Sequence, residues 1–340
     1  MEYAVYQPSL FGRWHDTKAE MGDRAGRLVV RVIRPSHSPN DTGPCPARRV
    51  VADSLIVMEY GPGTMPELPE VEIIRCGLRP VLEGRILSKV EVHTRFLRYP
   101  LPRGFSARLR GRRIERLSRR GKVLLAFLDD DKIWLTHLGM SGRMTVLTGS
   151  TEPRDKHDHL IFVTDRGHEI RFNDARRFGF MDLIVGGRVA GNKHLKFLGM
   201  EPLTDCLTAA SLSAALNGKR CTIKAALMDQ RVVAGLGNIY VCEALYWAGI
   251  SPRCNAGKIT GARSERLVSA IKEVLTTAIA AGGSSLRDFR HTDGDLGYFQ
   301  TKFSVYGREG KPCPRCIGKC SIRRFVQHGR STFYCAKFQR

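Results

Sequence analysis

The chain has 340 residues and is strongly basic: 55 Lys and Arg side chains stand against 33 Asp and Glu, which gives a formal net charge of +22 at pH 7. A chain of this length can bury a sizeable core, and we expect two or three domains. Such a surface predicts a polyanionic partner. Nucleic acid is favoured over a membrane surface because no long basic amphipathic helix accompanies the charge.

No apolar run has the length needed to span a bilayer, and the first residues lack a basic segment followed by an apolar one. We therefore expect a cytoplasmic protein with no membrane partner. In that compartment the ten cysteines are expected to be thiols or metal ligands rather than disulfides.

Residues 1–64 differ from the rest of the chain in charge and pattern. They hold eight basic and seven acidic side chains, so the positive charge belongs to the residues that follow. They mix Pro, Gly, Ser and Arg without a sustained helical or strand period. Two interpretations remain open, a disordered extension or upstream sequence attached by a start placed too early, and we favour the second.

The stretch Met65-Pro66-Glu67 reads like the start of a protein although it lies inside one. A chain begun at Met65 and trimmed by Met removal would expose Pro66 as a secondary amine. Inside a longer chain the same nitrogen belongs to a tertiary amide and carries no proton. The chemistry open to Pro66 therefore depends on where the working protein begins.

Helical patterns flank a region of strands. After Pro66, apolar residues at helical spacing predict a helix that ends near Gly84. From about residue 86 to 185, short apolar runs alternate with tight turns, which predicts a β-sandwich.

From about residue 195 the helical period returns, and we expect helices over residues 238–247 and 267–279. The stretch Gly235-Leu236-Gly237 before the first of them suits a phosphate, although an ordinary tight turn explains it at least as well.

Cysteines near the C-terminus have the spacing of a zinc ribbon. Phe338 stands where the fourth thiolate is expected, and Phe cannot bind a metal. Either Cys320 or His328 could take its place, so a zinc site and a metal-free hairpin held by packing both remain open. The candidate ligands are Cys313, Cys316, Cys335 and, as the fourth, Cys320.

Three further stretches carry side chains that could act on DNA. Lys122 belongs to a basic turn, residues 119–122, whose plain explanation is a solvated surface. Met140 lies within residues 137–142, either as part of the core or as a wedge between bases. Arg176 and Phe178 offer a cation and an aromatic ring that could fill the space left by a removed base.

Taken together, these stretches resemble the bacterial formamidopyrimidine-DNA glycosylases, which excise 8-oxoguanine and ring-opened purines. The resemblance runs from Met65 to the C-terminus, and the joint occurrence of the motifs in this order is highly specific. It rests on residues 66–72, 121–122, 137–142, 156–159, 176–179, 235–240, 305–308 and 329–335. Endonuclease VIII, a close relative, normally opens with Pro-Glu-Gly-Pro, so Leu68 favours the purine-directed branch.

The resemblance implies an α+β fold with a β-sandwich, a helix-two-turn-helix domain and a zinc-finger-like β-hairpin. Residues 66–190 are then the catalytic N-terminal helix and sandwich, residues 195–298 the helical DNA-binding domain and residues 300–340 the hairpin. Within the helical domain, residues 282–298 match a mobile loop that closes over a flipped base.

The resemblance also implies four catalytic roles. Pro66, as a free secondary amine, attacks C1′ of the damaged nucleotide and forms an iminium. Glu67 protonates the opening sugar ring. Lys122 donates a proton in β-elimination and contacts phosphate, and Arg330 holds the phosphate that leaves in δ-elimination. Because this chemistry needs a free amine, we expect the working protein to begin at Pro66.

For binding, the resemblance assigns DNA contacts to His157, Arg176, Lys219 and Asn238. Met140, Arg176 and Phe178 would occupy the void once the lesion is flipped out. The resemblance further implies one structural Zn²⁺ and a monomer that acts on damaged double-stranded DNA in the cytoplasm of a bacterium.

The leading hypothesis is therefore a bifunctional enzyme of base-excision repair that removes oxidised purines and nicks the abasic site by β,δ-elimination. Two alternatives stay open. One is an endonuclease VIII-like glycosylase for oxidised pyrimidines. The other is a non-catalytic protein that binds damaged DNA, if a real extension keeps Pro66 in an amide.

Overall fold

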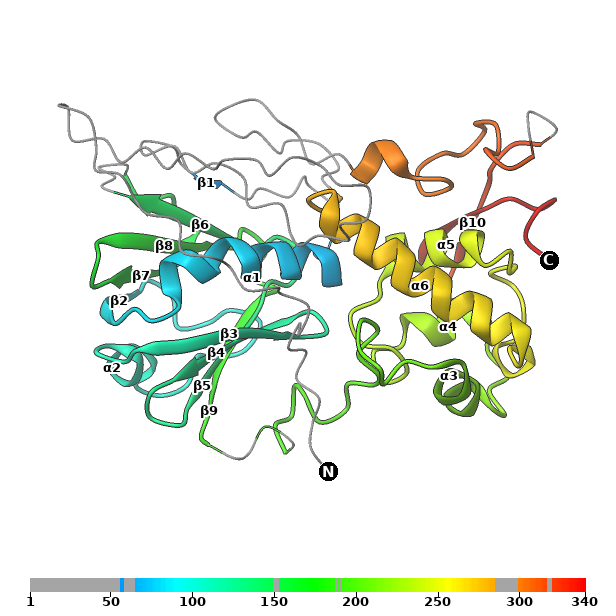
Figure 1. Cartoon of the computed structure of the whole chain (residues 1–340). Helices are drawn as coiled ribbons and strands as arrows, with labels where there is room; N and C mark the ends of the chain where they lie inside the picture. Colours follow the sequence, from blue (N-terminus) through cyan, green and yellow to red (C-terminus); the bar gives the residue numbers. More distant parts are fainter. Residues whose placement is uncertain are drawn as a thin grey trace, which may run out of the picture.

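The computed structural model describes residues 56–57, 65–148, 153–186, 189, 191–284, 299–316 and 320–340. Figure 1 shows a strand-rich half and a helical half side by side, with α1 (Leu68–Leu82) pointing its N-terminal end at the junction between them. The predicted order of helix, strands, helices and final hairpin is confirmed. No helix in the described part of the chain is long and apolar enough to cross a membrane.

The strand-rich half is a sandwich of two antiparallel sheets, as the sequence predicted. The first sheet has five strands in the order β1-β6-β8-β7-β2, and the second has four in the order β3-β4-β5-β9. The strands of the first sheet are β1 (Ile56–Val57), β2 (Leu87–Val92), β6 (Arg143–Thr148), β7 (Asp158–Thr164) and β8 (His168–Asn173). Those of the second are β3 (Ile114–Arg120), β4 (Val123–Leu128), β5 (Ile133–His137) and β9 (Phe180–Ile184), and the short helix α2 (Phe105–Leu109) precedes β3.

The inner strand β4 is apolar without interruption because both of its faces are covered. Successive side chains of a strand point to opposite faces. Leu124 and Ala126 enter the main core between the sheets and α1, whereas Val123 and Leu125 pack on the outer face with Leu195, from the segment that leads to the helical half. A strand buried on both faces shows no polar alternation.

The strand β1 belongs to the extension before Met65, in which no sustained helical or strand period is found. Ile56 pairs with Val146 and Val57 with Thr145, both on β6. An edge strand presents unpaired backbone groups that an extended segment can join, and two residues are too few to show a period. The other residues of the 1–64 extension lie outside the described ranges.

The helical half is built from α3 (Ala209–Leu216), α4 (Ile223–Met228), α5 (Asn238–Trp247) and α6 (Ala262–Ala280), with the 3₁₀ turns η1 (Ala256–Lys258) and η2 (Phe299–Lys302). The helices expected over residues 238–247 and 267–279 are confirmed, and α6 starts earlier than its apolar face suggested. Thr208 and Thr222 cap α3 and α4 through their hydroxyls, which accept backbone N–H groups of the first turn. Helix α5 is almost entirely buried because α4, α6 and the C-terminal hairpin surround it.

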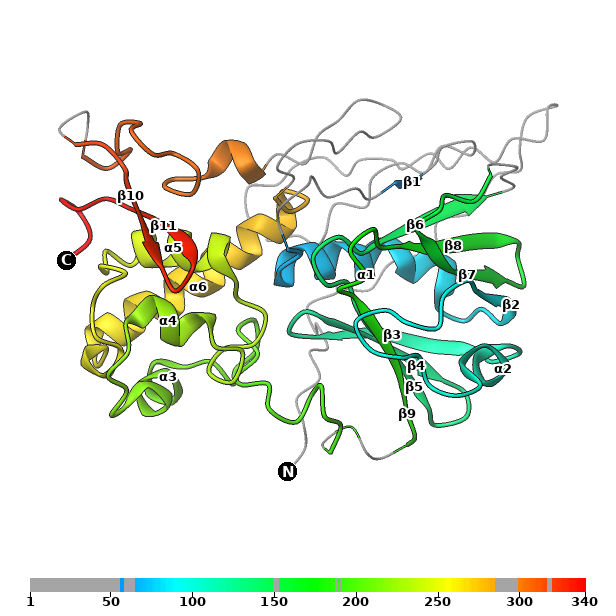
Figure 2. The ribbon, with the colours of Figure 1, turned by 180° about the vertical axis from the view of Figure 1, so that it is seen from behind.

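The C-terminal hairpin consists of β10 (Arg323–Gln327) and β11 (Arg330–Tyr334), seen against α5 in Figure 2. Gln327 pairs with Arg330, so only His328 and Gly329 form the turn. Both have positive φ, 50° and 70°, as a two-residue turn that matches the twist of a hairpin requires.

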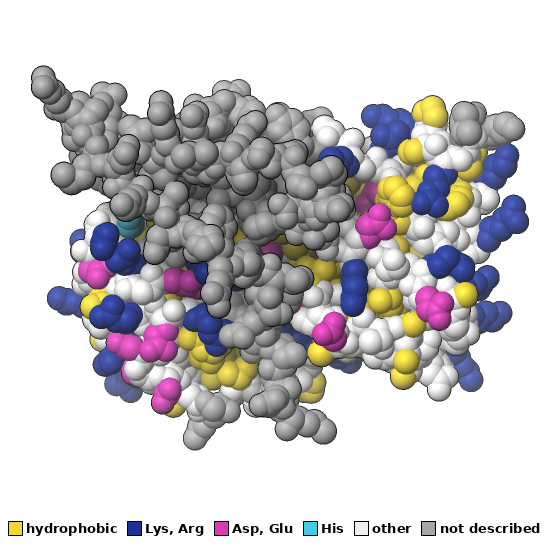
Figure 3. All heavy atoms as spheres, in the orientation of Figure 1, with side chains coloured by type: hydrophobic (Ala, Val, Ile, Leu, Met, Phe, Trp, Pro, Cys, Tyr) yellow, Lys and Arg dark blue, Asp and Glu magenta, His cyan; other side chains and the backbone are white. Residues whose placement is uncertain are grey.

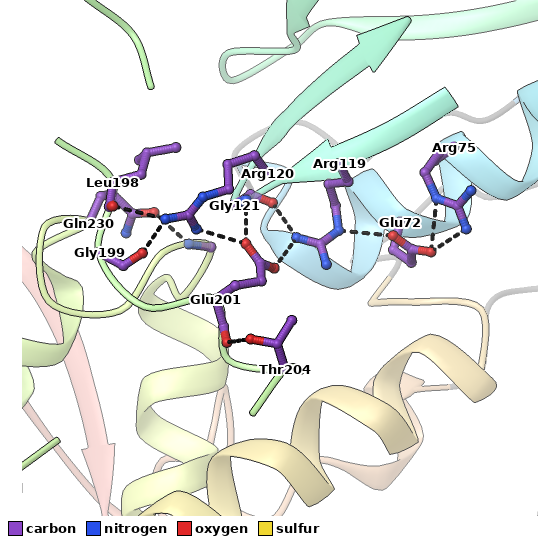
Figure 4. Close-up of polar contacts among 11 residues, drawn as sticks. Glu72, Arg75, Arg119, Arg120, Gly121, Leu198, Gly199, Glu201, Thr204 and Gln230 are labelled. Atoms are coloured by element: carbon purple, nitrogen blue, oxygen red, sulfur yellow. Dashed lines mark hydrogen bonds and ion pairs between the residues drawn. The ribbon is translucent and has the colours of Figure 1, made fainter. Parts of the chain in front are cut away.

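An ionic cluster joins the two halves (Figure 4). The guanidinium of Arg119, at the end of β3, is buried and pairs with Glu72 of α1 at 2.9 Å and with Glu201 at 2.5 Å. Glu201 also accepts from Arg120 and from the N–H of Gly121, each at 2.9 Å. The basic stretch of residues 119–122 is therefore not the solvated surface that its sequence suggested, because its two arginines pair with two carboxylates from other segments.

Candidate active site

Pro66 and Glu67 lie at the start of α1, at the junction of the two halves. Both are buried, and the N–H of Glu67 donates to Glu70 Oε2 at 2.9 Å, which closes the first turn of the helix. Pro69 fits this turn because its missing N–H would have no helical partner there. In the full chain the nitrogen of Pro66 is joined to Met65, so it is an amide nitrogen here.

The carboxyl group of Glu67 is packed against the N-terminus of α5. Its Oε1 accepts the N–H of Ile239 at 3.1 Å, and only 4% of the residue is exposed. Burial, with the nearby Glu70, raises the pKa of Glu67 to about 7, against the opposing effects of Lys122 and the backbone N–H groups of Ile239 and Tyr240. Its Oε2 has no hydrogen-bond partner among the described residues. Such a carboxyl can hold and deliver a proton near neutral pH.

The glycines before α5 are explained by this packing. A Cβ on Gly237 would lie 2.2 Å from the carboxyl carbon of Glu67, and one on Gly235, whose φ is +89°, would lie 2.6 Å from Leu68. The N–H of Leu68 donates to the carbonyl of Gly235 at 3.1 Å. The stretch is thus a tight turn shaped to receive the start of α1, which accounts for it without a phosphate.

Lys122 and Arg330 bring two cations to the same place from distant parts of the chain. Lys122 is the second residue of the two-residue β3–β4 turn, and Arg330 follows the turn of the hairpin. Burial lowers the pKa of Lys122, as does Arg330, while the charges of Glu67 and Glu70 oppose this effect. Lys122 is therefore close enough to both Glu67 and Arg330 for their charges to interact, and Pro66 precedes Glu67 directly in the chain.

Two loops of the sandwich carry Met140, Arg176 and Phe178, and they are packed together. The hydroxyl of Ser141 donates to Asp174 and accepts the N–H of Arg176 at 3.0 Å. A Cβ on Gly139 would lie 2.3 Å from the backbone of Phe178, so the close approach requires glycine there.

Two of the three side chains, those of Arg176 and Phe178, are exposed. Met140 is half-buried, and the guanidinium of Arg176 lies 4.9 Å from the ring centroid of the exposed Phe178. His157 is next to the second loop, since its carbonyl accepts the N–H of Asp174 at 3.1 Å. The loops therefore present an apolar tip, a cation and an aromatic ring together.

Lys219 and Asn238 lie in the helical half. Lys219, between α3 and α4, makes main-chain hydrogen bonds with Leu216 and Gly257, both at 3.1 Å. Asn238, the first residue of α5, donates from its amide to the carbonyl of Ser331 at 3.0 Å. Asn238 thus borders the hairpin that carries Arg330, whereas the described contacts of Lys219 lie within the helical half.

Four cysteines gather where the hairpin begins. The sulfurs of Cys313, Cys316, Cys320 and Cys335 all lie within 4.8 Å of one another. Sulfurs about 2.3 Å from a tetrahedral zinc ion would be about 3.8 Å apart, so the group fits such an ion. His328, in the hairpin turn, does not belong to this group among the described residues. Of the two substitutes for a ligand at position 338, the structure therefore supports Cys320.

A cluster around Glu70, which is buried beside Glu67, was not predicted from the sequence. Its Oε1 accepts the N–H of Ser284 at 2.9 Å, the hydroxyl of Ser284 at 2.8 Å and the hydroxyl of Tyr240. Glu70 lies in the opening motif and Tyr240 in the motif of α5, so their positions in two of the matching motifs were the available signal. The predicted loop over residues 282–298 begins here, and its residues 285–298 lie outside the described ranges.

Both halves of the chain match models of one protein family. The model of the formamidopyrimidine-DNA glycosylase N-terminal domain matches residues 65–181, and that of the formamidopyrimidine-DNA glycosylase H2TH domain matches residues 198–290. The formamidopyrimidine-DNA glycosylase of Ruegeria pomeroyi is 52% identical over 286 residues, and that of Rhodospirillum centenum is 53% identical over 290. Each match covers 81% of this chain and all of the relative. The chain belongs to the formamidopyrimidine-DNA glycosylase family.

Solved structures agree with this membership. The Lactococcus lactis Fpg in a complex with DNA containing an abasic site is 34% identical, with a TM-score of 0.73, and the match covers 81% of this chain and 99% of that one. The MutM (Fpg) protein of Thermus thermophilus is 38% identical with a TM-score of 0.69, over 81% and 98%. The family model begins at Met65, so the extension lies before the part shared with the glycosylases.

Proposed function

We propose that this protein is a bifunctional DNA glycosylase of base-excision repair that removes 8-oxoguanine and formamidopyrimidines and then cleaves the abasic site. The observation that carries the proposal is the convergence of Pro66, Glu67, Lys122 and Arg330, in which a buried carboxyl with a pKa of about 7 adjoins the nucleophile. A relative called formamidopyrimidine-DNA glycosylase matches over its whole length. The solved Lactococcus lactis Fpg is in a complex with DNA that contains an abasic site.

In the proposed reaction the secondary amine of Pro66 attacks C1′ and gives up its N–H proton. The damaged base leaves with the electrons of the glycosidic bond and takes up one proton. Glu67 delivers its proton to the ring oxygen as the sugar opens, which leaves an iminium between Pro66 and C1′. The iminium accepts electrons when a proton leaves C2′, so the bond from C3′ to its phosphate oxygen breaks.

The later steps use the two cations. Lys122 assists the β-elimination as a proton donor and contacts phosphate. A second elimination breaks the bond from C5′ to its phosphate oxygen, and Arg330 stabilises the phosphate that departs. Water then hydrolyses the iminium and restores the amine of Pro66.

Damaged double-stranded DNA is the proposed partner. Met140, Arg176 and Phe178 would fill the gap left by an extruded nucleotide, and His157, Lys219 and Asn238 would contact the backbone. Lys and Arg side chains line the edge of the helical half in Figure 3, as backbone binding requires. We place this reaction in the cytoplasm of a bacterium, by a protein that acts as a monomer.

We further propose that the four clustered cysteines hold one structural zinc ion, with Cys320 as the fourth ligand. The hydroxyl of Tyr246 lies 3.4 Å from the sulfur of Cys313 and would orient this ligand from outside the site. The ring centroids of Phe338 and Tyr246 are 5.4 Å apart. Phe338, which cannot bind a metal, therefore packs against the residue that contacts Cys313. The ion would hold the base of the hairpin and take no part in the reaction.

The chemistry requires a free amine, so we propose that the reactive form begins at Pro66, at the boundary of residues 1–64 and the catalytic region. Borohydride trapping tests this, because it reduces an iminium to a stable link between protein and DNA. The form that begins at Pro66 should be trapped on a duplex with 8-oxoguanine opposite cytosine, whereas the form with all 340 residues should not.

Two controls sharpen this test. The Glu67→Gln variant of the shorter form keeps the amine and should be trapped more slowly, and undamaged duplex should give no product. Absence of trapping by the shorter form would refute the proposal and leave a protein that only binds damaged DNA. Faster excision of thymine glycol than of 8-oxoguanine would instead indicate an endonuclease VIII-like specificity.

A further inference from the structure

Lys224 is a buried ammonium group to which the proposed reaction gives no task. It is the second residue of α4, and 2% of it is exposed. Its Nζ donates to the carbonyl of Ser331 at 3.1 Å and to the hydroxyl of Thr332 at 2.6 Å. A lysine buried to this extent is uncommon, because removing its charge from water costs free energy.

These contacts lie directly beside Arg330. Ser331 and Thr332 follow Arg330 on β11, so the ammonium group of Lys224 binds the two residues next to it. The carbonyl of Ser331 also accepts the amide N–H of Asn238 at 3.0 Å. A carbonyl oxygen has two lone pairs, and these two donors can use both. The backbone after Arg330 is thus held from α4 and α5 at once.

The other strand of the hairpin is held at the same level. The amide of Gln327 donates to the hydroxyl of Thr222 at 2.6 Å, and Thr222 is the N-cap of α4. Because Gln327 and Arg330 pair across the two-residue turn, the start of α4 is fastened to both strands where the turn begins and ends. Arg330 itself remains exposed.

The charge of Lys224 favours one direction for the exposed side chain of Arg330. Burial lowers the pKa of Lys224, and the positive charge of Arg330 lowers it further, whereas Cys242 and Glu67 oppose this. The two cations therefore lie close enough to repel each other. A fixed cation behind the hairpin disfavours a guanidinium folded back onto α4 and favours one directed away from it.

We propose that Lys224 is a positioning residue for Arg330, which docks the hairpin turn on α4 so that the guanidinium meets the phosphate released in δ-elimination. The proposal rests on the proposed function through the role given there to Arg330. Lys224 does not touch the DNA in this scheme, and it acts only through the backbone of Ser331 and the side chain of Thr332.

The test follows β- and δ-elimination separately on a duplex with a preformed abasic site, under single-turnover conditions. It uses the form that begins at Pro66, which corresponds to the whole length of the relatives. Lys224→Met keeps the aliphatic stem and removes the donors. We expect its β-elimination to proceed within about twofold of wild type and its δ-elimination to slow at least tenfold, as in Arg330→Ala.

Three comparisons make the result decisive. Lys224→Met combined with Arg330→Ala should be no slower in δ-elimination than Arg330→Ala alone. Both substitutions remove the same contribution, that of the positioned Arg330 guanidinium. Thr332→Val, which is isosteric, should give a smaller loss in the same step and decides the matter if Lys224→Met does not fold. Lys89→Met, on a distant exposed lysine of β2, should behave like wild type.

Equal slowing of both steps in Lys224→Met and Thr332→Val, or a further loss in the double variant, would overturn the role of Lys224 while leaving the glycosylase proposal intact. An unchanged ratio of products in Arg330→Ala would instead overturn the role of Arg330, and the inference with it. Absence of any strand cleavage by the wild type would refute the proposed function itself.

Discussion

Replacing Glu67 by Gln should stabilise the full-length protein at neutral and alkaline pH while it impairs the chemistry. The carboxyl of Glu67 is buried beside Glu70, and its pKa is raised from 4.5 to about 7. The folded protein therefore binds this proton more tightly than the unfolded chain does. The contribution of this bound proton to the free energy of unfolding is fully present below pH 4.5 and is lost as the pH rises through 7.

The size of the effect follows from the shift. At 1.36 kcal/mol per unit, the change in pKa corresponds to a loss of about 3 kcal/mol for the wild type between acid and neutral pH. Gln stays neutral like the protonated acid, and its amide oxygen can still accept the N–H of Ile239. The difference in free energy of unfolding between Glu67→Gln and wild type should thus rise from near zero at pH 4.5 to about 3 kcal/mol above pH 7.

Urea unfolding of both proteins at pH values from 4.5 to 8.5 measures this difference. Glu115→Gln, on an exposed side chain of β3, is the matched control and should show little difference from wild type at any pH. A difference for Glu67→Gln that is independent of pH, or a variant less stable than wild type at pH 8, would refute the argument that burial holds the proton on Glu67.

Three further predictions concern packing, charge and metal. Gly237→Ala should abolish strand cleavage in the form that begins at Pro66, because its Cβ would lie 2.2 Å from the carboxyl of Glu67; cleavage at the wild-type rate would contradict this. Arg119→Met should lower the free energy of unfolding by about 3–5 kcal/mol in urea titrations, since it leaves two buried carboxylates without their shared partner, and a loss under 1 kcal/mol would contradict it. Cys320→Ser should abolish the binding of one zinc ion per chain, measured by elemental analysis, whereas Phe338→Leu should retain it; one zinc ion retained by Cys320→Ser would exclude Cys320 as a ligand.

The layers of the fold could be predicted from the sequence because their periods are local. The short runs that became β4 and β5, and the stripe on α6, depend on residues a few positions apart. The strand β1 could not be predicted in this way, because its pairing with β6 depends on a free sheet edge distant in sequence. Ile56 and Val57 form a strand because they pair with β6.

In the candidate site, too, some features follow from local sequence and others from partners distant in sequence. The motifs that resemble the family predict Pro66 and Arg330 as site residues, but no local pattern reveals that Arg119 is buried whereas Lys122, three residues later, is half-buried. Arg119 is buried because Glu72 and Glu201, from two other segments, meet it there. A charge run is solvated by default, and only the assembled partners change that outcome.

The cysteine group shows why spacing alone was an incomplete guide to a metal site. A ribbon template expects a pair of thiolates in each of two turns, and Phe338 breaks the second pair. In the folded chain the N–H of Cys313 donates to the carbonyl of Cys320 at 3.0 Å, so the two ends of residues 313–320 are held together. The sulfur of Cys320 then lies 3.3 Å from that of Cys335, which directly follows β11. Tetrahedral coordination requires four sulfurs around one ion, and the order of the cysteines in the sequence does not matter. A ligand lost after Cys335 can therefore be replaced by one before β10.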